Sequence, residues 1–114
     1  MNEYVFLYRR PAKDRTVQQM QESMMRWQAW FKQMEESGRL ANYGKPLDTK
    51  GGRVVKDKKG SCTDGPYSET KDLVVGFSVI LAKDYDEAVA LTNGHPIFDQ
   101  DGMIEIRPVF KMEP

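Results

Sequence analysis

Residues 73–81 read Leu-Val-Val-Gly-Phe-Ser-Val-Ile-Leu, a run that is mostly apolar and rich in β-branched side chains. The run is too short and too rich in Val and Ile to favour a helix, so it predicts a buried central strand. Residues 4–8, Tyr-Val-Phe-Leu-Tyr, are apolar at every position and predict a second strand. A strand with one face in water alternates apolar and polar residues, so both of these strands are expected to be covered on both faces.

Two helices are predicted around these strands. Apolar side chains recur with the helical period through residues 16–37, and Gly38 follows where a C-terminal cap is expected. The predicted apolar stripe consists of Val17, Met20, Met24, Trp27, Phe31 and Met34, with Trp30 beside it and Met25 on the polar face. Residues 84–93 predict a shorter helix, which Asp84 caps and which Asn93-Gly94 ends, with Pro96 preventing its resumption.

The remaining strands are shorter. Residues 39–46 and 53–56 are predicted as strands joined by a turn at Gly51-Gly52, and residues 103–110 as the last strand. This order predicts an α+β fold, a ferredoxin-like split βαβ sandwich in which both helices cover one face of an antiparallel sheet. Because two helices leave the other sheet face bare, we expect a second copy to cover it, giving a homodimer with sheets packed face to face.

Length and composition argue against several classes of function. The 114 residues predict one domain spanning residues 1–114, and 17 basic against 17 acidic side chains argue against nucleic-acid binding. No apolar run approaches the roughly 18 residues of a membrane span, and the N-terminal residues do not resemble a signal segment. Cys62 is the only cysteine and His95 the only histidine, so neither an intrachain disulfide nor a metal site is expected, and a cytoplasmic location is the simplest inference.

Two regions carry side chains that are candidates for binding or catalysis. Asp64-Gly65-Pro66 has the composition of a turn, and the functional alternative is a loop that presents Asp64 at a binding site as it enters the central strand. In that alternative Gly65, Pro66, Tyr67, Glu69 and Lys71 line the site. His95 titrates near neutral pH and is the candidate acid or base, although its place after the second helix also suits a purely structural residue.

Arg107, on the last predicted strand, is a candidate anion ligand or an ordinary salt-bridged strand residue. We further expect His95 and Asp64 to share one solvent-accessible pocket. Since a strand and the helix after it run in opposite directions, the loops that carry these residues should lie at the same end of the sheet. A neighbouring carboxylate would then raise the pKa of His95.

The segments 64–71, 76–77, 95–96 and 104–109, taken in order, resemble the YCII-related family and more closely its DGPF branch, with Tyr67 in place of the Phe. The resemblance covers nearly the whole chain and implies a ferredoxin-like, dimeric α/β-barrel fold. It also implies that His95-Pro96 matches the His-Pro of the DGPF branch. Trp27 stands about where simpler family members carry a helical histidine.

Two functions follow as expectations. The first is a small enzyme without a cofactor that acts on a small aromatic or anionic molecule, with His95 as acid or base and Asp64 as its orienting carboxylate. The second is a non-catalytic dimeric module that binds a small ligand or a regulatory partner through the same loop. The two are distinguished by whether His95 and the Asp64 loop converge on one concave pocket.

Overall fold

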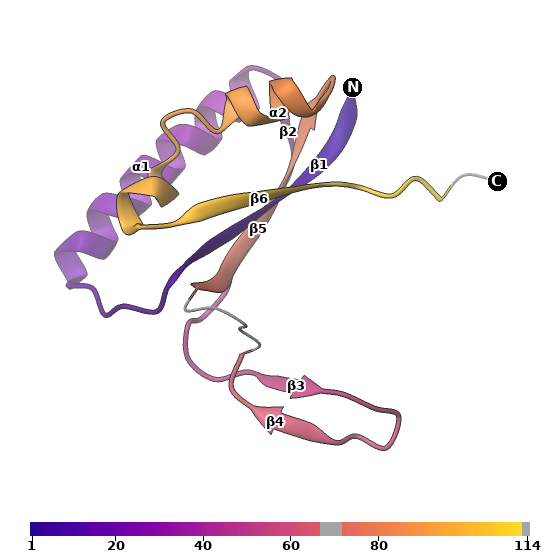
Figure 1. Ribbon diagram of the computed structural model, residues 1–114. Coiled ribbons are helices and arrows are strands. Elements are labelled where there is room, and N and C mark those ends of the chain that lie inside the picture. Colours follow the sequence, from indigo (N-terminus) through magenta and orange to yellow (C-terminus); the bar gives the residue numbers. More distant parts are fainter. Residues whose placement is uncertain (67–71, 113–114) are drawn as a thin grey trace.

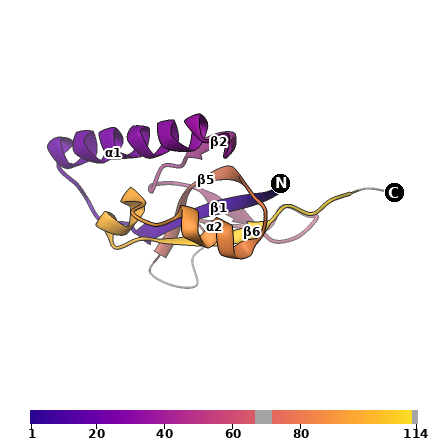
Figure 2. The ribbon, with the colours of Figure 1, turned by 90° about the horizontal axis from the view of Figure 1, so that it is seen from above.

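The computed structural model describes residues 1–66 and 72–112 (Figure 1). The chain forms β1 (Asn2–Pro11), α1 (Val17–Glu36), β2 (Leu40–Pro46), β3 (Arg53–Val55), β4 (Cys62–Asp64), β5 (Asp72–Ala82), α2 (Tyr85–Leu91), the 3-10 helix η1 (Pro96–Gln100) and β6 (Met103–Pro108). The four-stranded sheet has the order β2-β5-β1-β6, and every neighbouring pair is antiparallel. Both α-helices lie on the same side of this sheet (Figures 1 and 2), which confirms the predicted α+β, ferredoxin-like arrangement.

Alternation along β1 divides its side chains between the two faces of the sheet. Tyr4, Phe6 and Tyr8 point toward the helices and are at most 5% exposed. The residues between them occupy the opposite face, where Val5 lies directly across from Val79 of β5. No helix or strand of the described part of the chain lies over that opposite face, as Figure 1 shows.

The hairpin of β3 and β4 forms a second, separate sheet that projects from one end of the body (Figure 1). The sequence predicted that residues 39–46 and 53–56 form neighbouring strands, but β2 joins the main sheet and β3 pairs with β4 instead. The projection makes the molecule extended. Its radius of gyration is 15.7 Å, against about 13 Å for a compact domain of this length.

Helix α1 begins and ends close to the predicted residues, but its buried line differs from the predicted stripe. Its buried residues are Ser23, Trp30 and Met34, and Trp27 packs against them half-buried. By contrast, Met20 is 43% and Met24 60% exposed. The predicted stripe is therefore wrong in its first half, because the sheet beneath that half of the helix is separated from it by a cavity.

The segment after α2 also differs from expectation. Pro96 was expected only to stop a helix, yet it stands in the first turn of η1, a position where its fixed φ and missing N–H are tolerated. Gly102 then lets η1 lie close against β1, since a Cβ at this position would come within 2.8 Å of the Arg9 carbonyl oxygen. Together these residues hold η1 on the sheet.

The corrected orientation of α1 yields a stability prediction. Trp30 is 5% exposed and packs on Phe6, so Trp30→Ala should lower the free energy of unfolding by about 3–5 kcal/mol. Met25 is 69% exposed, so Met25→Ala should change it by less than about 0.5 kcal/mol. Urea unfolding measures both values. Equal losses in the two variants would mean that the helix presents a different face to the sheet.

Candidate functional site

A cavity of about 480 Å³ lies between α1 and the sheet strands β1, β2 and β5. Its volume falls in the range of about 300–1,000 Å³ that is typical of small-molecule sites. The wall that α1 contributes is mostly apolar, with Met20, Met24, Trp27 and Phe31 beside the polar Ser23 and Gln28. Tyr43 on β2 faces these residues, with its ring centroid 5.3 Å from that of Phe31. The cavity therefore accounts for the apolar half of α1 that is not buried in the core.

Local backbone irregularities shape the sheet side of the cavity. The register of β2 against β5 shifts around Asn42 and Lys45, and between them Gly44 has a φ of +74°. A Cβ on Gly44 would lie 1.6 Å from the Phe77 carbonyl oxygen, so only glycine permits this approach of β2 to β5. The Ser78 hydroxyl donates a hydrogen bond to the Tyr43 carbonyl oxygen (2.8 Å) and ties the two strands together at this point.

Two buried polar atoms in the cavity wall lack a hydrogen-bond partner of good geometry. They are the hydroxyl oxygen of Tyr8 and Nη1 of Arg15. Burial raises the pKa of Tyr8 far above its usual value, and the neighbouring Ser78 hydroxyl offsets this only in part. Tyr8 is therefore a neutral hydroxyl at physiological pH. Because buried polar groups are normally paired, these two atoms mark the polar part of the cavity wall.

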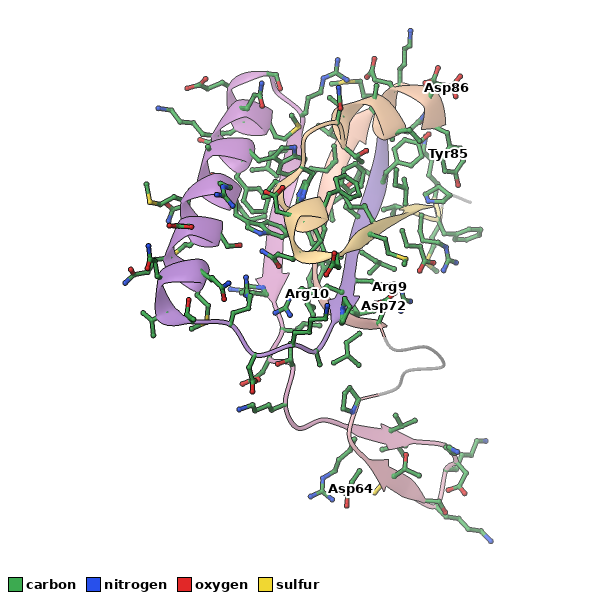
Figure 3. The ribbon with its side chains drawn as sticks, turned by 60° about the vertical axis from the view of Figure 1, so that its left-hand side comes forward. Arg9, Arg10, Asp64, Asp72, Tyr85 and Asp86 are labelled. Carbon is green, nitrogen blue, oxygen red and sulfur yellow. The ribbon has the colours of Figure 1, made fainter. Side chains whose placement is uncertain are left out.

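Arg10 adds a second guanidinium beside Arg15. It follows Tyr8 on the helix-facing row of β1, and Figure 3 shows it on the side of α1, with Arg9 on the other side. Burial lowers the pKa of Arg10, and the charge of Arg15 lowers it further. Within the described residues neither arginine forms an ion pair with a carboxylate. This end of the cavity thus carries two guanidinium groups.

A second, polar recess of about 370 Å³ adjoins the cavity, and its wall carries charged side chains of both signs, with the carboxylates of Asp14, Glu22, Asp99 and Asp101 among them. The two share Arg10, Arg15, Ser23 and Gln100 in their walls. The side-chain amide of Gln100 donates a hydrogen bond to the Ser23 hydroxyl and so fixes η1 against α1 between the two spaces. Arg10 and Arg15 therefore lie at the boundary between the mostly apolar cavity and the polar recess.

His95 lies in the core rather than in the cavity. It is 1% exposed, and its ring stacks on Tyr8 and meets Trp27 and Trp30 edge-on at 4.6 and 4.4 Å between centroids. Its Nδ1 accepts a hydrogen bond from the backbone N–H of Ile97 (3.0 Å), which makes His95 the N-cap of η1. Burial lowers the pKa of His95 to about 3. The expectation of a raised pKa was wrong because aromatic rings, not a carboxylate, surround the imidazole.

Asp64 lies on the projecting hairpin, where Figure 3 shows it away from the sheet and helices. Its side chain is 90% exposed and pairs with Arg53 at 3.4 Å. The structure therefore does not bring His95 and Asp64 together, and the shared solvent-accessible pocket was a wrong prediction. The topological reasoning failed because residues 62–64 form a strand of an independent hairpin instead of a loop folded against the end of the sheet.

The other predicted site residues are dispersed. Gly65 and Pro66 lie at the base of the hairpin, where the Gly65 N–H donates to the Gly52 carbonyl oxygen (2.9 Å). Arg107 lies opposite Val5, hence on the bare sheet face, and pairs with Glu105 at 3.6 Å. Tyr67, Glu69 and Lys71 lie outside the described residues.

The sequence interpretation missed Tyr8, Arg10 and Arg15 as site residues. In the sequence-based prediction Arg10 only marks the end of the first strand. Its signal was the two-residue alternation itself, because the row of Tyr4, Phe6 and Tyr8 continues to Arg10 and places a cation on the buried face. Arg15 carries no comparable signal, since it precedes α1 in an irregular segment.

The burial of a neutral histidine yields a pH prediction. Between about pH 3 and 6.5 the unfolded chain binds a proton at residue 95 that the folded chain excludes, so stability falls as the pH is lowered through this window. A His95→Gln variant should show a dependence weaker by up to about 1.4 kcal/mol per pH unit. Urea unfolding of both proteins from pH 4.5 to 7 tests this. Identical slopes would show that residue 95 is equally protonated in both states.

Comparison with known protein families gives a match over nearly the whole chain. The family model of the YCII-related domain matches residues 1–113. No curated protein shows a significant match to the chain. Among the described residues, no helix has the length and hydropathy needed to cross a bilayer. Since the family match extends over nearly the entire sequence, the chain belongs to the YCII-related family.

Proposed function

We propose that this protein is a small-molecule-binding module whose ligand occupies the cavity between α1 and the sheet. One observation carries the proposal: Arg15 Nη1 and the Tyr8 hydroxyl, both buried without a hydrogen-bond partner of good geometry, lie in the wall of a mostly apolar space. Leaving such groups unpaired costs about 1–3 kcal/mol each, and a polar ligand would offset that cost.

The binding function is favoured over the enzyme with His95 as acid or base. The described part of the cavity wall contains no carboxylate, imidazole or thiol. A general acid or base must reach its substrate by a hydrogen bond, and His95 is enclosed by aromatic rings. The groups that do line the cavity bind and orient, but they do not exchange protons readily near neutral pH.

Methionine methyl NMR tests the location of the ligand. Titration with benzamide, a small neutral aromatic probe, should shift the methyl signals of Met20 and Met24, which line the cavity. Met25 follows directly in the helix but lies outside the cavity wall, so its signal is the internal control. Phe31→Ala removes part of the wall and should weaken the response. Shifts at Met25 alone, or none at all, would contradict binding in this cavity.

We also propose that the module is a homodimer, paired through the sheet face opposite the helices. Val5, Leu7, Val79 and Leu81 share that face, and the register places Arg107 and Glu105 beside them. An apolar sheet face of this kind is normally covered, and a second copy offers an identical apolar face. We expect an interface of roughly 2,000 Å² or more in total.

A single charge on the sheet face should separate the dimer. Val79→Lys places an ammonium group at the centre of the proposed interface and should produce a monomer in light scattering at micromolar concentration. Val89→Lys is the matched control, because Val89 lies 57% exposed on α2 and away from that face. A wild-type protein that is already monomeric at micromolar concentration would contradict the proposal.

Two finer assignments accompany these proposals. We place the chain in the DGPF branch of the family, supported by Asp64-Gly65-Pro66 and by His95-Pro96. We also propose a cytoplasmic location, supported by Cys62, an exposed and unpaired thiol of the kind that persists in a reducing environment.

A further inference from the structure

We propose that the ligand class is an aromatic carboxylate, whose carboxylate binds Arg10 and Arg15 while its ring lies among the aromatic side chains of the cavity. This inference rests on the proposed function, which requires only that a small molecule occupies the cavity. The side chains around the cavity further specify the charge and the shape of that molecule.

The charge follows from the two guanidinium groups. Arg10 and Arg15 both line the cavity and the recess, and burial together with the nearby charge of Arg15 lowers the pKa of Arg10. Arg10 Nη1 donates to the Pro11 carbonyl oxygen (3.2 Å), and Arg15 Nη1 is buried without a partner. Two like charges held together in this way are relieved by an anion between them, and planar guanidinium groups match the planar carboxylate.

The wall opposite this charged end determines the rest of the ligand. Trp27 and Phe31 of α1 have ring centroids 6.0 Å apart, and Phe31 lies 5.3 Å from Tyr43 of β2. Aromatic rings prefer offset or edge-to-face contact with other rings, so this wall suits a flat aromatic body. The Met20 and Met24 side chains, flexible and half-exposed, adjust to its outline at the mouth.

A carboxylate fits this end better than a phosphate. Phosphate sites at helix N-termini use the free N–H groups of the first turn. Here α1 begins with a closed capping box, in which the Gln19 N–H is bonded to the Thr16 hydroxyl and the Thr16 N–H to the Gln19 side chain. The unpaired donor that the cavity wall offers belongs to a side chain, Arg15 Nη1.

Calorimetric and NMR titrations with four probes test the inference. Benzoate should bind the wild-type protein about tenfold more tightly than neutral benzamide, the size of effect expected for a charge-assisted hydrogen bond. Acetate, which lacks the ring, and phenyl phosphate should both bind more weakly than benzoate. Arg15→Gln and Arg10→Gln should each abolish the preference for benzoate over benzamide. The matched control is Arg53→Gln, which removes one positive charge from the hairpin, away from the cavity, and should keep that preference.

The possible outcomes separate this inference from the proposed function. If neither benzoate nor benzamide binds, the proposed function itself fails. If both bind equally at the Met20 and Met24 methyl groups, the cavity binds ligands but the carboxylate assignment is overturned. Phenyl phosphate binding more tightly than benzoate, or loss of the preference in Arg53→Gln as well, also overturns it. An unchanged preference in both Arg10→Gln and Arg15→Gln would place the anion elsewhere.

Discussion

The pairing of β1 with β5 is the constraint on which the rest of the structure depends. Its register puts Tyr4, Phe6 and Tyr8 under the helices and leaves Val5 and Leu7 on the bare face. A shift by one residue would exchange these two sets completely. Core, cavity wall and proposed dimer face are therefore all consequences of a single alignment. The irregularity between Tyr8 and Arg9 marks where that alignment changes, at the edge of the cavity.

The same alignment explains why the binding site and the titratable histidine are separate. Tyr8 contacts both: its ring stacks on His95, while its hydroxyl lies in the cavity wall. His95 supports Tyr8, Trp27 and Trp30 from the core side, and it caps η1. His95 thus helps to position the aromatic side chains beside the cavity, and its buried ring does so in the neutral form.

The sequence predicted the fold well because the fold depends on local periodicity. The runs at residues 4–8 and 73–81 and the helical spacing before Gly38 each identify an element, and their order gives the topology. The site was predicted poorly because it depends on long-range placement. Asp64-Gly65-Pro66 has the composition of a turn, and only the pairing of residues 62–64 with β3 carries Asp64 away from the body. His95 shows no signal that distinguishes a buried cap from an exposed base.

The β3–β4 hairpin is a part of the molecule that can change with little effect on the folding of the rest. A two-stranded ribbon of this size buries little apolar surface and contributes little to the cooperative unfolding of the body. Changes in its length or charge therefore leave the global free energy of unfolding nearly unaffected. Relatives with the same core could vary this hairpin widely in sequence, so selection on it would reflect what it meets outside the body rather than how the chain folds.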